Sequence, residues 1–147
     1  MSSAAVPSTV LSTVVRRATA ADTASVRVLD GRAFGFTWED ADAALLEGVL
    51  DPDRFVVAEE TGDHGLPAAD ALVGAAGSYA FTMTVPGGAR LPVPGVTWVA
   101  VALHQRRRGL LRRMLADLHA GLVAEGAALA VLTASEATLY GRYGYGA

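Results

Sequence analysis

Residues 98–113 read WVAVALHQRRRGLLRR, and this stretch decides the fold of the chain. Its first part is apolar and β-branched, which predicts a strand over Val96 to Leu103 that is buried on both faces. After a short polar turn, leucines recur at steps of three and four residues, which predicts an amphipathic helix from Arg107 to about Gly126. The stretch therefore joins a buried strand to the beginning of a long helix.

The beginning of this helix has the chemistry of an anion site. A helix N-terminus carries unpaired backbone N–H groups and a partial positive charge, so it attracts phosphate. Gly109 places no side chain where a diphosphate would approach the backbone, and Arg107, Arg108 and Arg112 can add charge-assisted hydrogen bonds. The chain has 12 basic residues, all arginine, and five of them lie between positions 106 and 113. We therefore expect a phosphate site here; a solvated basic helix end or a nucleic-acid patch is the alternative.

The residues before this stretch begin with a strand and two helices. A short strand is expected over Val14 to Ala18, followed by a helix that Thr19 or Asp22 caps and that runs to about Phe34. Thr37 and Asp40 stand at capping-box spacing and predict the start of a second helix. Apolar positions of this second helix include Ala41, Ala44, Leu45 and Val49, and Asp51-Pro52-Asp53 ends it.

Two more strands precede residue 96 and one follows the long helix. The first is expected over 54–60 and the second, after a Gly/Pro turn at 61–70, over 72–85, where Pro86-Gly87-Gly88 ends it. A last strand is expected over 128–133, and Ser135 is a plausible N-cap for a short helix through Tyr140. The order β-α-α-β-β-β-α-β-α predicts an α/β (α+β) domain over 14–147, with a mixed, mostly antiparallel sheet and helices on both faces. Residues 1–13 are expected to be a flexible tail.

Composition excludes several classes of function. The 147 residues carry a net charge of −3, which argues against a nucleic-acid binder, and they contain no cysteine, which excludes disulfides and thiolate chemistry. His64, His104 and His119 have no spacing that would bring two imidazoles to one metal, so no metal is expected. No apolar run approaches membrane-spanning length, and no signal peptide is evident. The sequence therefore predicts a soluble, cytoplasmic protein without a membrane partner.

The stretch from Arg106 to Leu111 resembles motif A of the GCN5-related N-acetyltransferases (GNAT superfamily), whose pattern is Gln/Arg-x-x-Gly-x-Gly/Ala at a strand-to-helix junction. Arg106 and Gly109 match the pattern, whereas Leu111 stands where glycine or alanine is usual. With that departure, the chain resembles the enhanced intracellular survival family in Val99-Ala100-Val101-Ala102, in Ala134-Ser135-Glu136 and in the run YGRYGYG at 140–146. Members of that family acetylate amines of aminoglycosides and of lysine side chains, with acetyl-CoA as the donor.

The resemblance implies how acetyl-CoA would be held. Backbone groups in the last part of the strand would pair with the pantetheine arm, and one N–H there would polarise the thioester carbonyl. The helix start would hold the pyrophosphate, and two residues after the last strand would line the same crevice. The cofactor-binding residues implied are Val99, Ala100, Val101, Arg107, Arg108, Gly109, Leu110, Leu111, Arg112, Ser135 and Glu136.

The resemblance also implies the catalytic and acceptor residues. Tyr140 would be the general acid that protonates the departing CoA thiolate, because a phenol with a pKa near 10 stays protonated at neutral pH. Tyr143 and Tyr145 are its rivals on chemistry alone. Trp98 and Phe36 would wall the amine pocket, although both could equally be core aromatics.

The family fold continues with two more strands after the short helix, so the resemblance implies a C-terminally truncated fragment whose last strands are missing. It also implies a hexamer for the full-length protein and a general base outside this chain. The leading interpretation is an acetyl-CoA-dependent N-acetyltransferase acting on a small-molecule amine or a protein lysine. A non-catalytic acyl-CoA-binding or assembly module is the alternative, and nucleic-acid binding is disfavoured by the net acidity.

Overall fold

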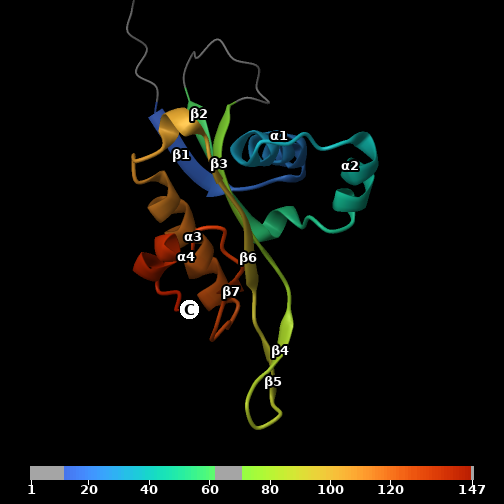
Figure 1. Cartoon of the computed structure of the whole chain (residues 1–147), viewed down its shortest axis with the longest axis vertical. Helices are drawn as coiled ribbons and strands as arrows, with labels where there is room; N and C mark the ends of the chain where they lie inside the picture. Colours follow the sequence, from blue (N-terminus) through green and yellow to red (C-terminus); the bar gives the residue numbers. More distant parts are fainter. Residues whose placement is uncertain (1–11, 62–70, 147) are drawn as a thin grey trace, which may run out of the picture.

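The computed structural model describes residues 12–61 and 71–146, and Figure 1 shows their arrangement. A five-stranded sheet has the order β1-β2-β3-β6-β7. Its strands are β1 (Ser12–Arg17), β2 (Phe55–Thr61), β3 (Leu72–Tyr79), β6 (Gly95–Val101) and β7 (Val131–Leu132). Only the β6–β7 pair is parallel, which confirms the predicted mixed, mostly antiparallel sheet. The expected tail lies outside the described residues up to position 11, and Ser12 and Thr13 already belong to β1.

Helices cover both faces of this sheet. On one face, α3 (Leu110–Ala124) packs a stripe of buried side chains against β2, β3 and β6, as the sequence predicts. Gly74 allows this close approach, because a Cβ at that position would lie 2.7 Å from the sulfur of Met114. On the other face, α1 (Thr23–Phe34) packs Val26 and Leu29 against Phe55, Val57 and Trp98. Strand β2, which lies between β1 and β3, is buried from Phe55 to Ala58 because both of its faces are covered.

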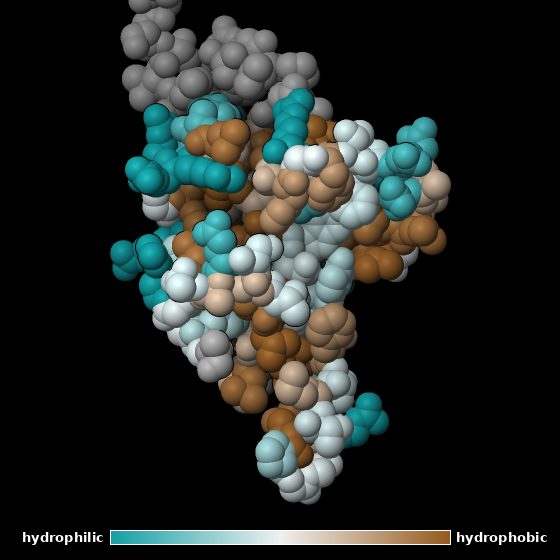
Figure 2. Space-filling view, viewed as in Figure 1, coloured by the Kyte–Doolittle hydropathy of each residue, from teal (hydrophilic) through white to brown (hydrophobic). Residues whose placement is uncertain are grey.

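The predicted capping box of the second helix is wrong, and its apolar positions do not face the core. Helix α2 (Asp40–Glu47) begins at a capping box made by Glu39 and Asp42, so Thr37 and Asp40 do not form one. Ala41, Ala44, Leu45 and Val49 all lie exposed, and Leu45 is 73% exposed. The side chains that pack on the core are instead Leu46 and Leu50. Figure 2 shows hydrophobic side chains on the flank of the molecule where α2 lies.

The expected long strand over 72–85 is two strands of different sheets. β3 ends at Tyr79, and β4 (Thr82–Thr84) pairs with β5 (Arg90–Pro92) in a separate two-stranded sheet. Gly87 and Gly88 have φ values of 92° and 84°, so they form the turn of this hairpin. Just after the break, the Phe81 ring covers Gly95, where a Cβ would meet the ring at 2.4 Å. The hairpin projects beyond the sheet in Figure 1.

Smaller differences concern the residues at which other elements begin and end. β6 stops at Val101, and Leu103 begins the short helix η4 (Leu103–Gln105) with its side chain exposed. The expected strand over 128–133 pairs only at Val131 and Leu132. The turn expected at 61–70 lies outside the described residues from position 62 onward.

The entry into α1 rests on one buried carboxylate. Asp22 accepts hydrogen bonds from the Thr19 backbone and hydroxyl, at 2.8 and 2.9 Å, and from both terminal nitrogens of Arg16, at 2.8 and 2.9 Å. It also belongs to the capping box of the short helix η1 (Ala20–Asp22) that precedes α1. The Arg16 guanidinium holds the pKa of the Asp22 carboxyl down to about 2, from an ordinary 3.8.

We expect Asp22→Asn to lower the free energy of unfolding at pH 7 by about 2 kcal/mol, the value that such a pKa difference represents. A carboxyl whose folded pKa is depressed stabilises the fold above its unfolded pKa and loses that effect as the pH falls through the folded value. The difference in the free energy of unfolding between variant and wild type, measured by urea denaturation, should therefore shrink from pH 4 to pH 2. Asp117→Asn, at an exposed carboxylate on α3, is the control and should change little; an equal loss there would refute the assignment.

Candidate functional site

Strands β6 and β7 part after two residue pairs. Gly95 pairs with Val131 and Val96 with Leu132, and β6 then continues alone on that side to Val101. The Ala102 N–H donates to the Val73 carbonyl at 2.9 Å, so the alternation of an antiparallel pair turns the polar backbone groups of Val101 away from β3. The Arg106 Nε approaches the Val101 carbonyl on that side at 3.5 Å. The last part of β6 therefore has one polar edge that β7 does not cover.

The same alternation gives the backbone groups of Ala100 a different direction. Ala100 pairs with Ala75 and lies two residues before Ala102, so its N–H and C=O groups are directed to β3. Of the expected trio, Val101 is directed to the open edge by this alternation, Ala100 is not, and Val99 lies next to the shift in register. The sequence could not distinguish them, because the direction of the backbone groups depends on the register with β3.

A bulge at Trp98 sets which side chains face which helix. The register with β3 jumps from the Thr97–Gly77 pair to the Ala100–Ala75 pair, and Trp98 has a φ of 55°. Val96 consequently packs on the α3 face, whereas Trp98, two residues later, packs on the α1 face. The bulge therefore lies where β6 leaves β7, and it turns Trp98 away from α3.

The N-terminus of α3 is open. Gly109 is the N-cap residue, with a φ of 74°, and it has no side chain that could cap the first turn. The first helical hydrogen bond runs from the Arg113 N–H to the Gly109 carbonyl at 3.2 Å, so the N–H groups of Leu110, Leu111 and Arg112 have no partner in a preceding turn. A Cβ on Gly109 would meet nothing within 4 Å. The helix start therefore combines free donors with free space, as an anion site requires.

The five arginines around this helix start divide into two groups. Arg113 donates to the Thr13 carbonyl at 3.1 Å, Arg108 to the Gln105 side chain at 3.3 Å, and Arg106 approaches Val101. Arg107 and Arg112 are exposed and have no hydrogen bond or ion pair with any residue of 12–61 or 71–146. Figure 2 shows hydrophilic side chains gathered over η4 and the beginning of α3. Arg107 and Arg112 are thus the cations available to a ligand.

Only the backbone of Leu110 can contribute to such a site. Its side chain is buried in the core under the sheet, and the Leu111 side chain packs beside that core. The N–H groups of both leucines stay at the open helix end. This arrangement fits the predicted contact of Leu110 and Leu111 with a phosphate through main-chain atoms.

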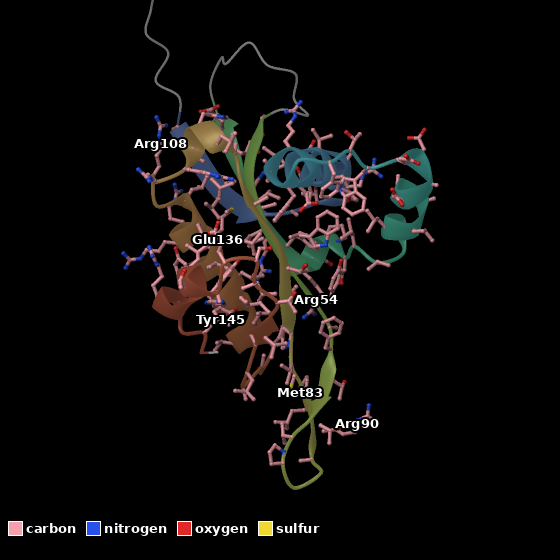
Figure 3. All side chains as sticks on the ribbon, viewed as in Figure 1. Arg54, Met83, Arg90, Arg108, Glu136 and Tyr145 are labelled. Carbon is pink, nitrogen blue, oxygen red and sulfur yellow. The ribbon has the colours of Figure 1, made fainter. Side chains whose placement is uncertain are left out.

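Ser135 and Glu136 follow β7 and lie exposed before α4 (Ala137–Tyr140). The N-cap position of α4 belongs to Glu136, so the predicted cap at Ser135 is wrong by one residue. In Figure 3, Arg108 lies at the end of the molecule where α3 begins, and Glu136 lies on the same flank below it. The segment after β7 and the helix start thus belong to one side of the molecule.

Tyr140 is half-buried beside the core that α3 covers. Burial raises the pKa of its phenol above 10, and the nearby Tyr143 and Glu136 act in the same direction. Its hydroxyl makes no hydrogen bond to the residues that the structure describes. The rival Tyr145 differs, because its hydroxyl lies 2.8 Å from Nε2 of His119, whose pKa is lowered by burial. The rings of Tyr140 and Tyr145 meet edge to face at 6.0 Å, so the Tyr145 ring supports Tyr140 while the Tyr145 hydroxyl is engaged with His119.

Trp98 and Phe36 belong to one aromatic cluster on the α1 face. The Trp98 ring stacks on Trp38 at 5.3 Å, Phe36 packs edge-on against Trp38 at 5.1 Å, and Trp98 Nε1 donates to the Tyr79 hydroxyl at 2.7 Å. Phe36 is 45% exposed, whereas Trp98 is 9% exposed. Phe36 can therefore line a surface pocket, and Trp98 can only support its wall from below. Trp38, which joins the two, was missed, although an aromatic beside Phe36 in a predicted loop was the available signal.

The sequence also missed Gln105 and Glu60. Gln105 is the buried residue of η4, and its side-chain Nε2 donates to the buried Glu60 carboxylate at 2.7 Å. A glutamine before three arginines carries no distinctive pattern, and its partner lies 45 residues earlier in the chain. These two residues connect the helix-start loop to β2.

Two classes of feature are absent from the described part of the chain. In residues 12–61 and 71–146, no three His, Asp or Glu side chains gather in a way that could hold a metal ion. None of the helices placed there is long and apolar enough to cross a membrane.

Comparison with known proteins gives concordant results. Residues 14–147 match the family described as acetyltransferase (GNAT) domain. An uncharacterized N-acetyltransferase of Streptomyces coelicolor is 47% identical over 118 residues, which cover 79% of this chain and 27% of that protein. The N-acetyltransferase Eis of Mycobacterium tuberculosis is 49% identical over 75 residues, or 51% of this chain and 19% of Eis. The chain thus spans about a quarter of the length of the Streptomyces relative.

Solved structures show the same fold. Eis1 from Mycobacterium abscessus superposes with a TM-score of 0.73 at 29% identity, over 92% of this chain and 31% of Eis1. The aminoglycoside N-acetyltransferase AAC(6')-Iy, solved in complex with CoA, superposes with a TM-score of 0.66 at 17% identity, over 97% of this chain and 93% of that protein. At that identity the second likeness concerns the fold alone.

Proposed function

Because the chain belongs to the acetyltransferase (GNAT) domain family, we propose that it transfers an acetyl group from acetyl-CoA to an amine. The observation that carries the proposal is the open N-terminus of α3. Gly109 in a left-handed conformation, the N–H groups of the first turn and two arginines without partners among the described residues lie beside the uncovered edge of β6. A long substrate with a diphosphate at one end and an amide-rich arm fits this combination of an anion site and an open strand edge.

We assign the diphosphate to the helix start. The N–H groups of Leu110, Leu111 and Arg112 would donate to phosphate oxygens, and Arg107, Arg108 and Arg112 would add charge-assisted hydrogen bonds. The backbone of Val101, with that of Val99 beside the bulge, would pair with the amide-rich arm along the open edge of β6. Ser135 and Glu136 would line the opposite side of the crevice.

We assign to Tyr140 the role of the general acid that protonates the leaving group. Acetyl-CoA supplies a thioester whose sulfur leaves as a thiolate, and a neutral phenol can give that thiolate a proton. Support comes from the raised pKa of Tyr140 and from its hydroxyl, which has no hydrogen-bond partner among residues 12–61 and 71–146, whereas the Tyr145 hydroxyl is paired with His119. A backbone N–H at the end of β6 would polarise the thioester carbonyl.

The acceptor is proposed to be an aminoglycoside or lysine-type amine. The exposed ring of Phe36, backed by Trp38 and Trp98, gives an aromatic wall on the α1 side of the sheet. A cationic amine is attracted to such a face. A homo-oligomeric assembly, a hexamer by family resemblance, and a cytoplasmic location belong to the same proposal.

A non-catalytic acyl-CoA-binding or assembly module is the second candidate. It would use the same helix start and the same strand edge, and it would bind acetyl-CoA without acetylating any amine. Mass spectrometry of aminoglycosides and lysine peptides incubated with the protein and acetyl-CoA separates the two candidates, because only the enzyme adds an acetyl group to an acceptor.

The binding step is tested with the double variant Arg107→Ala/Arg112→Ala in isothermal titration calorimetry with acetyl-CoA. We expect affinity to fall roughly a hundredfold, because each lost charge-assisted hydrogen bond costs about 1.5 kcal/mol or more. The wild-type affinity should also fall as salt is raised, and the variant should show a weaker salt dependence.

The matched control is Arg90→Ala/Arg142→Ala, which removes the same charge from two exposed positions away from the helix start. This variant should bind as tightly as the wild type. The proposed site would be refuted if the Arg107→Ala/Arg112→Ala variant bound acetyl-CoA as tightly as the wild type, or if the wild type did not bind acetyl-CoA.

A further inference from the structure

The loop between β6 and α3 is fixed to the rest of the protein by one buried polar pair. Glu60, at the end of β2, is 6% exposed, and Gln105, in η4, is 3% exposed. Gln105 Nε2 donates to Glu60 Oε1 at 2.7 Å, and Nε2 of His104 lies 3.9 Å from the other oxygen, Oε2. A buried carboxylate is unfavourable unless donors satisfy it. Both oxygens of Glu60 therefore face residues of this loop.

The same pair reaches one of the arginines at the helix start. The amide oxygen of Gln105 accepts a hydrogen bond from Nη1 of Arg108 at 3.3 Å. A continuous series of side-chain hydrogen bonds thus runs from Glu60 in β2 through Gln105 to Arg108. Of the residues from Leu103 to Gly109, Gln105 alone is buried, so this side chain is what attaches the loop to the core.

The loop needs such an attachment because its backbone is held in a rare conformation. Arg107 has a φ of 63° and Gly109 a φ of 74°. A non-glycine residue in this region costs roughly 1–2 kcal/mol and persists only where its surroundings enforce it. Without the buried pair, the loop would relax toward conformations in which Arg107 and the α3 N–H groups no longer converge.

We propose that Glu60 is a positioning residue for the diphosphate-binding loop, acting through Gln105 on Arg107, Arg108 and the first turn of α3. The inference rests on the proposed acetyl-CoA site. Glu60 itself is buried behind the loop and would not touch the ligand. Its negative charge would weaken phosphate binding if it acted directly, so any favourable effect has to pass through the hydrogen bond to Gln105.

Four variants test the hydrogen bond separately from the charge. Glu60→Gln keeps an acceptor for Gln105 and should bind CoA within about twofold of the wild type. Glu60→Ala removes the acceptor, and Gln105→Glu places two carboxylates face to face; each should bind CoA about tenfold more weakly, which is the net value of one hydrogen bond. The exchange Glu60→Gln/Gln105→Glu restores an amide–carboxylate pair in the reverse order, and it should recover most of the lost affinity.

The readout is the Kd of the whole chain for CoA and for acetyl-pantetheine, which carries the thioester arm but no diphosphate. A positioning role predicts weaker CoA binding by Glu60→Ala and Gln105→Glu with unchanged acetyl-pantetheine binding. In steady-state assays, the KM for acetyl-CoA should rise while kcat and the KM for the amine stay near wild type.

Three outcomes overturn the inference. Normal CoA binding by Glu60→Ala and Gln105→Glu would show that the loop holds its shape without the pair. Equal losses for CoA and acetyl-pantetheine, or an exchange variant that does not recover, would show a general structural role. If the wild-type protein binds no CoA at all, the proposed acetyl-CoA site is wrong. If the wild type binds CoA, and the Arg107→Ala/Arg112→Ala variant binds it more weakly while the Glu60 and Gln105 variants bind normally, only the role of Glu60 is refuted.

Discussion

Tyr140→Phe should lower kcat for amine acetylation by roughly two to four orders of magnitude, the usual contribution of a general acid. The substitution removes only the hydroxyl, and the phenyl ring keeps its edge-to-face contact with Tyr145. Binding of acetyl-CoA should stay near wild type, because Tyr140 is not among the residues proposed to hold the diphosphate. The effect should therefore appear in kcat and not in the Kd for the donor.

The control for this experiment is Tyr143→Phe, which removes a hydroxyl from the neighbouring half-buried tyrosine. It should retain turnover within about threefold of the wild type, in the range of substitutions outside catalytic contacts. Tyr145→Phe breaks the 2.8 Å contact with His119 and should cost stability more than turnover. Wild-type kcat in Tyr140→Phe, or a comparable loss in Tyr143→Phe, would remove the general-acid assignment from Tyr140.

The pH profile provides a second measurement on the same residue. Burial raises the pKa of Tyr140 above its ordinary value, so its phenol is protonated at neutral pH. Loss of the acid on the alkaline side should then begin at a higher pH than for an exposed tyrosine, and kcat at neutral pH should be insensitive to the titration of this group. An alkaline limb that falls near pH 8 in the wild type and is absent from Tyr140→Phe would contradict the raised pKa.

The sequence predicted the elements that have a strong local period. The leucine stripe of α3, the glycine at its start and the strand before it follow from local spacing, and the structure has all three. The helix at Thr23–Phe34 was predicted for the same reason, and it ends at Gly35 with a φ of 81°. These elements position the proposed site, so its location was predictable from residues 98–113.

The sequence could not predict features that depend on distant partners. Which leucines in and just after α2 pack on the core depends on how the helix sits against the sheet: Leu46 and Leu50 pack there, whereas Leu45 and Val49 are exposed. The β-forming residues continue from 72 to 85 without a turn residue at the break after Tyr79, so the sequence predicts one strand where the structure has β3 and β4 in different sheets. The Glu60–Gln105 pair joins residues whose relation appears only after β2 and η4 are folded together.

The second large effect should come from Gly109, whose φ of 74° is required for the open helix start. An alanine there disfavours the left-handed conformation by roughly 1–2 kcal/mol. The binding-competent loop then becomes a minor population, and the apparent Kd rises by the inverse of that fraction, which is about tenfold. A valine is more restricted and would also occupy the space open to the diphosphate, so we expect roughly a hundredfold loss for Gly109→Val.

Gly126 provides a matched control at the other end of the same helix. It has a φ of 85°, and a Cβ there would also meet nothing within 4 Å. Alanine or valine at either glycine should lower the free energy of unfolding by a similar amount, about 1 kcal/mol or more. Only the Gly109 variants should lose CoA affinity in calorimetry, because only that end of α3 presents free N–H donors. If the Gly126 variants lose CoA affinity to the same extent, the loss reflects a weakened helix, and the phosphate site at Gly109 has to be abandoned.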